Sequence, residues 1–268
     1  MDINRWIENA DEKPLECFPA NGGFCGILRT VGCIGDSLSS GEFERHEPDG
    51  SMAYFDCFDY SWGQFFARMT GNTVYNFSRG GMTAREYLES FAEANGFWAP
   101  EKACRAYIIA LGVNDLLNLW GEVGSLEDIN LEDPSKNKPT FTGYYAAIVQ
   151  RLKQISPQAK FFFMTMPVQQ LDAEREKLAD LHAVRMHELA GFFENSYVLD
   201  FRAYAPVNDA AFRERFYLNG HLNPCGYALT GHMVTAYIDY IIRHNLNDFR
   251  EIGLIGEQPW LKLPAAGV

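Results

Sequence analysis

The stretch of sequence that decides the fold reads ILRTVGCIGDSL, residues 27–38. Its first eight residues are mostly apolar, and Gly35, Asp36 and Ser37 follow them directly. A short apolar run that ends in glycine is typical of a strand buried on both faces of a sheet. The stretch therefore predicts a buried strand with polar side chains just beyond its carboxyl end.

Four further runs of this kind follow, at residues 73–77, 106–111, 160–166 and 197–201. The apolar residues between them recur at helical spacing. Thr83 and Glu86 form a capping-box pattern that starts one helix, and a last, largely apolar helix is expected at about residues 227–244. Alternating strands and helices predict a three-layer α/β/α fold with a parallel sheet. In such folds the ligand site lies at the carboxyl ends of the strands.

The length of 268 residues suits one large domain or two small ones. We expect a single domain over residues 1–268, because the polar segments that must converge span residues 35–221. Three segments fit the alternation poorly. Residues 1–26 are expected to be an N-terminal extension, and residues 40–60 and 118–142 to be loop insertions at the active edge.

Charge and hydropathy exclude several classes of partner. The 23 Lys and Arg residues against 35 Asp and Glu give a net charge of −12, and no basic cluster favours nucleic acid. The sequence contains no run of 18 apolar residues, so we expect no membrane span. The first residues do not form a secretory signal, so we expect a cytoplasmic protein if Met1 is the natural start. The oligomeric state is left open.

Polar residues that could carry chemistry follow the runs. They lie in Gly35-Asp36-Ser37-Leu38, in Asn76 to Thr83, in Gly112-Val113-Asn114-Asp115, and in Asn219-Gly220-His221 before the last helix. A serine hydroxyl becomes a good nucleophile when an adjacent imidazole takes its proton. Glycine amides and an asparagine side chain can supply neutral donors to a developing oxyanion. We interpret Asp36 and Asp115 as structural partners of their loops.

In this order the four segments resemble the SGNH (GDSL-type) esterase/lipase family, over about residues 27–245. The resemblance implies an α/β/α fold with a flavodoxin-like strand order, and ester hydrolysis by a serine, with no cofactor or metal. It makes Ser37 the nucleophile and His221 the general base. It assigns the oxyanion hole to the backbone N–H groups of Ser37 and Gly81 and to the side-chain amide of Asn114. Gly81 is chosen because it precedes Thr83 by two residues; Gly80 is the alternative.

One position departs from the family pattern. The family usually has an aspartate three residues before the catalytic histidine, and this chain has Leu218 there. Three replacements are open: a backbone carbonyl near Leu218, the side chain of Asn219, or a carboxylate from elsewhere, Asp200 or Asp209.

The resemblance gives a serine esterase that acts on a small-molecule ester, either an acetylated carbohydrate or a short-chain acyl ester. The alternative is a catalytically weak ligand-binding module of the same fold, which the missing aspartate would explain. His182 and His187 are five residues apart and do not share a helix face, so we do not expect them to form a metal site.

Overall fold

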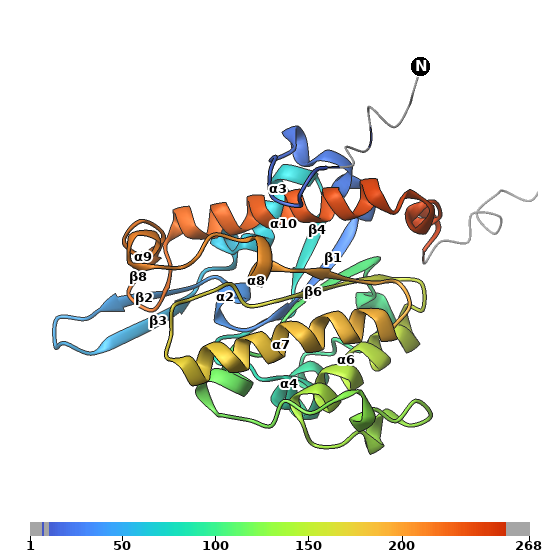
Figure 1. Cartoon of the computed structure of the whole chain (residues 1–268), viewed down its shortest axis with the longest axis horizontal. Helices are drawn as coiled ribbons and strands as arrows, with labels where there is room; N and C mark the ends of the chain where they lie inside the picture. Colours follow the sequence, from blue (N-terminus) through green and yellow to red (C-terminus); the bar gives the residue numbers. More distant parts are fainter. Residues whose placement is uncertain (1–6, 8–10, 256–268) are drawn as a thin grey trace, which may run out of the picture.

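The centre of the fold is a five-stranded sheet, described by a computed structural model that covers residue 7 and residues 11–255 (Figure 1). The strand order is β4-β1-β5-β6-β7, and every neighbouring pair is parallel. The bounds are β1 Thr30–Gly35, β4 Thr73–Asn76, β5 Ala106–Ala110, β6 Lys160–Met164 and β7 Ser196–Leu199. Each strand overlaps one of the five predicted runs, so the predicted parallel sheet is confirmed.

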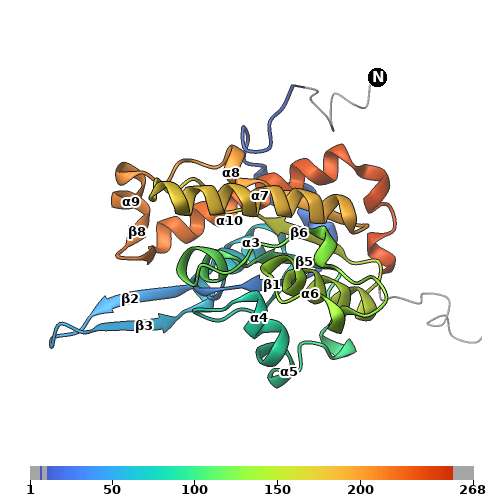
Figure 2. The same ribbon diagram turned by 60° about the horizontal axis from the view of Figure 1, so that its bottom comes forward.

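Helices cover both faces of this sheet, which confirms the three-layer fold (Figures 1 and 2). One face carries α3 (Trp62–Thr70) and α10 (Pro224–His244), and the other carries α4 (Ala84–Glu86), α6 (Phe141–Ile155) and α7 (Ala173–Phe192). Side chains alternate between the two apolar cores along each strand. Phe161 and Phe163 of β6 pack with α6 and α7, whereas Phe162 packs with α10.

The helix predicted to start at Thr83 does so, because the Thr83 hydroxyl accepts a hydrogen bond from the Glu86 amide at 3.1 Å. It continues through a wider turn, Tyr87–Phe91, into α5 (Ala92–Ala94). The short α8 (Phe201–Tyr204) and α9 (Ala210–Phe216) lie between β7 and α10. No helix in the described part of the chain is long and apolar enough to span a membrane.

The segment 40–60 was predicted to be a loop, and that prediction is wrong. It folds into an antiparallel hairpin of β2 (Glu42–His46) and β3 (Met52–Asp56), which projects from the body of the molecule (Figure 2). The turn between them closes through a hydrogen bond from the Glu47 amide to the Ser51 carbonyl and holds Gly50 at a φ of 85°. Its charged and aromatic strands lack the apolar alternation by which a half-buried strand is predicted.

The other two unusual segments differ from each other. Residues 118–142 stay mostly irregular, with single 3₁₀ turns at Leu126–Asp128 and Pro134–Lys136. Of the predicted extension 1–26, residues 1–6 and 8–10 lie outside the described residues. The helical turns at Ala20–Leu28 pack against α3 and α10, and the Phe24 amide donates to Asp239 Oδ1 at 2.7 Å.

Candidate active site

Ser37 lies at the carboxyl end of β1 and is the first residue of α2 (Ser37–Ser40). The residue that caps this turn is Asp36, whose carboxylate accepts a hydrogen bond from the Leu38 amide at 3.1 Å. The half-buried Ser37 is therefore not the helix cap that a serine at such a turn often is. No described residue forms a hydrogen bond with its hydroxyl, and its amide stands at a helix N-terminus, where negative charge is favoured.

The second and third segments are held together by side-chain hydrogen bonds to backbone. The Asn114 amide donates to the Met82 carbonyl at 3.1 Å and accepts from Asn118 at 2.8 Å. Asp115 accepts a hydrogen bond from the Ala84 amide at 2.9 Å. This contact fits its interpretation as a structural partner of the loop. These contacts place Asn114 beside the glycine loop 80–81.

The two glycines of this loop have different surroundings. Gly81 has a φ of 72°, and the space beside it is open. A Cβ on Gly80 would collide with the carboxylate of Glu42. Because a carboxylate repels an oxyanion, the Gly81 amide is the better placed of the two to stabilise one.

His221 is supplied by a second small hairpin, formed by β8 (Tyr217–Leu218) and β9 (His221–Leu222). Leu218 pairs with His221 across this hairpin, and Asn219 makes its turn with a φ of 59°. The hairpin lies beside β2 (Figure 1). The His221 side chain is 17% exposed, so its ring is largely enclosed.

The two ring nitrogens of His221 face two carboxylates from β2. Nδ1 lies 2.5 Å from Oε1 of Glu44, and Nε2 lies 3.2 Å from Oε1 of Glu42. The second oxygen of Glu44 accepts a hydrogen bond from the Gly220 amide at 2.9 Å. Since alternate residues of a strand share one face, Glu42 and Glu44 point the same way.

None of the partners proposed for His221 from the sequence is the group at Nδ1. Asp200 accepts from Thr165 at 3.1 Å and contacts His187 at 2.8 Å, and Asp209 caps α9 at the Phe212 amide. Leu218 and Asn219 belong to the turn itself. Sequence reasoning missed Glu44, because no short-range pattern connects it to His221.

Burial makes this part of the molecule electrostatically unusual. It raises the pKa of Glu42, an effect that Asp56 and Glu44 strengthen and His221 opposes. Burial also raises the pKa of Asp36 to about 6 and that of Asp115 to about 7. Arg79, the cation near the glycine loop, is paired with Glu86 at 2.6 Å. The site is therefore acidic.

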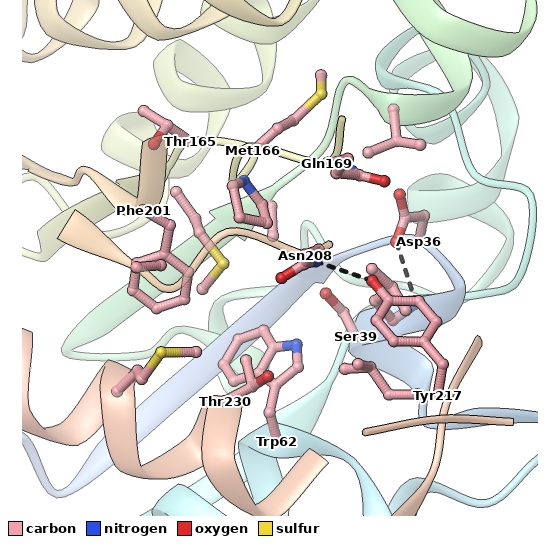
Figure 3. A pocket seen from close by; sticks show the side chains of 18 of the residues that line it. Asp36, Ser39, Trp62, Thr165, Met166, Gln169, Phe201, Asn208, Tyr217 and Thr230 are labelled. Atoms are coloured by element: carbon pink, nitrogen blue, oxygen red, sulfur yellow. Dashed lines mark hydrogen bonds between the residues drawn. The ribbon is translucent and has the colours of Figure 1, made fainter. Parts of the chain in front are cut away.

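An apolar cavity of about 90 Å³, lined by Asp36, Leu38 and Ser39, lies at the carboxyl ends of β1, β5 and β6 (Figure 3). The residues that flank the proposed catalytic groups, Asp36, Leu38 and Leu222, contribute to its wall. The Ser39 hydroxyl points into it and has no hydrogen-bond partner among the described residues. The remaining wall is rich in methionine and aromatic side chains, including Met164, Met166, Met233, Trp62 and Phe201.

The histidines of α7 have structural contacts. His182 is fully buried with Nε2 3.0 Å from the Leu111 carbonyl, and burial lowers its pKa to about 4. His187 contacts Asp200. Within residues 11–255, no group of three or more His, Cys, Asp or Glu side chains is placed to hold a metal ion.

Solved structures of similar fold include several esterases. A family two carbohydrate esterase from Clostridium thermocellum is 16% identical with a TM-score of 0.56, over 82% of this chain and 64% of that one. A family two enzyme from Corynascus thermopiles is 15% identical (TM-score 0.55; 78% and 65% covered). The psychrotrophic esterase EstA of a Pseudoalteromonas species is also 15% identical (TM-score 0.53; 80% and 98% covered).

No curated protein sequence matches the chain. Residues 33–229 match the model of the GDSL-like Lipase/Acylhydrolase family, and this range contains all four polar segments. The match covers well over half of the sequence, and the sheet order agrees with an SGNH hydrolase fold. The chain therefore belongs to the GDSL-like lipase/acylhydrolase family, as the resemblance implied.

Proposed function

We propose that the protein is a serine esterase that works through Ser37, His221 and Glu44. The observation that carries the proposal is the Glu44 carboxylate at 2.5 Å from Nδ1 of His221. A carboxylate at Nδ1 fixes the tautomer that leaves Nε2 free to accept a proton, and it stabilises the imidazolium that then forms. Because it supplies the acid that is missing at position 218, this contact favours an esterase over a weak binding module.

In the first half of the proposed reaction, Ser37 Oγ attacks the ester carbonyl carbon and its proton passes to Nε2 of His221. The oxyanion is stabilised by the Ser37 and Gly81 amides and by the Asn114 side chain. The tetrahedral intermediate then collapses, and the alcohol leaves with the proton from Nε2. In the second half, water attacks the acyl-enzyme, gives its proton to Nε2, and releases the acid as Ser37 regains its proton.

The cavity next to Asp36 and Leu38 supports a short acyl group, because apolar side chains form most of its wall. Its apolar wall favours an acetyl or short aliphatic chain over a polar one. We therefore place acetyl and short-chain acyl esters first, as the sequence suggested.

The direct test is hydrolysis of p-nitrophenyl acetate by the wild type and by Ser37→Ala. We expect the variant to lose at least about 10³-fold in kcat, because the nucleophile is removed. An ethyl p-nitrophenyl phosphonate should add the mass of its ethyl phosphonyl group to the wild type, with release of p-nitrophenol, and should not add it to the variant. Equal hydrolysis by both proteins would refute Ser37 as the nucleophile.

A further inference from the structure

The Glu42 carboxylate has one oxygen for which the described residues supply no donor. The Glu42 side chain is only 14% exposed, and within the described part of the chain its one ion-pair or hydrogen-bond partner is Nε2 of His221. The carboxylate lies between this nitrogen and Gly80. A largely buried carboxylate oxygen without a donor is costly unless something else supplies the hydrogen bond.

The position of Glu42 makes the substrate the natural source of that donor. In the proposed reaction the leaving alcohol oxygen takes its proton from Nε2 of His221, so the alcohol half must approach this atom. Glu42 Oε1 lies 3.2 Å from the same nitrogen. A hydroxyl group on the carbon next to the ester-bearing carbon, three bonds from the ester oxygen, would therefore come within hydrogen-bonding distance of Glu42.

The facing strand of the hairpin adds a second carboxylate, that of Asp56, which accepts a hydrogen bond from Ser40, and an aromatic ring. Asp56 is directly opposite Glu42 in the register, and Tyr54 is opposite Glu44, so the four side chains share one face. The Tyr54 ring is 59% exposed, and its centroid lies 6.3 Å from that of His221. Carboxylate acceptors beside an exposed aromatic ring suit a neutral molecule with several hydroxyl groups and repel an anionic one.

We propose that Glu42 determines specificity by accepting a hydrogen bond from a free hydroxyl next to the ester in the alcohol half of the substrate. The preferred substrates are then partly acylated polyols, with carbohydrates as the main class. This inference rests on the proposed function, because it requires His221 to face the leaving alcohol.

The test compares two esters that differ only in the donor. One is a methyl pyranoside with a single acetyl group and a free neighbouring hydroxyl, and the other carries a methyl ether in place of that hydroxyl. The wild type should prefer the first by about 10- to 100-fold in kcat/KM, as expected for a hydrogen bond to a charged group. Glu42→Ala should abolish the preference, and Glu42→Gln should keep part of it through its amide oxygen.

Two controls separate the possible roles of Glu42. Asp49 lies at the exposed tip of the same hairpin, so the Asp49→Asn variant should keep the full preference for the hydroxylated ester. p-Nitrophenyl acetate has no hydroxyl, so Glu42→Ala should change its hydrolysis much less than that of the hydroxylated sugar ester. An equal loss on all three esters with the preference retained would overturn the inference, because Glu42 would then act through His221 alone.

The inference and the proposed function fail in different ways. Hydrolysis of p-nitrophenyl acetate by the wild type without any preference between the two sugar esters would refute the inference alone. Failure of the folded wild type to hydrolyse any of the three esters would refute the proposed function and the inference together.

Discussion

At the scale of single residues, the two carboxylates of β2 give His221 its chemical setting. Glu44 takes the place next to Nδ1 that the family usually fills with an aspartate three residues before the histidine. Its second oxygen is held by the Gly220 amide, so the carboxylate is fixed from two sides. This double attachment lets a residue 177 positions away act as a neighbour of the histidine.

The first prediction concerns Glu44→Gln. The variant keeps the shape of the side chain and loses the charge that stabilises the imidazolium, so kcat should fall on the order of 10²- to 10⁴-fold. Steady-state kinetics on p-nitrophenyl acetate measure the effect. Asp209→Asn, which preserves the cap of α9, is the matched control and should keep wild-type kcat. If Asp209→Asn lost more activity than Glu44→Gln, the assignment of Glu44 would be wrong.

The second prediction uses the buried carboxyl of Asp115. Burial raises its pKa from 3.8 to about 7, so the folded protein binds this proton more tightly than the unfolded chain. The stability that this proton contributes is complete below about pH 4 and is lost as the pH rises through 7. Asp115→Asn, which cannot ionise, should therefore gain stability relative to wild type as the pH rises from 4 to 8.

Urea unfolding at pH 4.5 and pH 8 measures this difference. The relative gain of Asp115→Asn between the two values should be about 1–3 kcal/mol, since each unit of pKa shift corresponds to about 1.4 kcal/mol. Asp133→Asn is a suitable control, because Asp133 lies on the surface and its pKa is lowered by Ser135. A free-energy difference between Asp115→Asn and wild type that does not change with pH would contradict the prediction.

At the scale of elements, the β2–β3 hairpin carries Glu42 and Glu44, so its position determines how both carboxylates face His221. It starts at Gly41, which has a φ of 80° and lies against the Cys57 carbonyl and the Ser61 amide. Only glycine adopts this conformation without strain, and here it also leaves no room for a Cβ. The start of the hairpin is consequently fixed by backbone packing.

The third prediction compares Gly41→Ala with Gly50→Ala. Both positions have a positive φ, so both variants should lose about 1–2 kcal/mol of stability. At Gly41 the new Cβ must also displace the hairpin, and kcat should fall about 10- to 100-fold as Glu44 moves. At Gly50 the surrounding space is open, so kcat should stay close to that of wild type. Similar kcat values for the two variants would show that the hairpin does not position the site.

At the scale of the whole molecule, the sheet is shared by two apolar cores. Phe162 belongs to the core under α3 and α10, and Phe163 to the core under α6 and α7. Adjacent residues of one strand thus connect the two helical layers. The single domain that we expected from the spread of the polar segments stays a prediction, which unfolding experiments can test.

The fourth prediction is that Phe162→Ala and Phe163→Ala destabilise one common unfolding transition. Each variant leaves a cavity in a core and should lose about 3–5 kcal/mol of unfolding free energy. Calorimetry of both variants should show one peak whose midpoint falls in each case. Two separate peaks, with each variant shifting a different one, would contradict a single domain.

Local sequence patterns predict most of the fold and name the candidate site residues. The five apolar runs predicted the strands because a strand buried on both faces must be apolar along its length. The segments around Ser37, Gly81, Asn114 and His221 were predicted to meet because the carboxyl ends of parallel strands share one edge.

Only the tertiary structure shows how His221 is held. Glu44 has no sequence pattern that connects it to His221, because their contact depends on how two small hairpins pack beside the sheet. The β2–β3 hairpin was not predicted from the sequence, because its strands project from the body and carry charged residues instead of a buried apolar face. Local patterns predict which residues lie at the edge of the sheet. Packing between distant segments places Glu44 against His221, and a short-range pattern carries no information on a contact between residues so far apart.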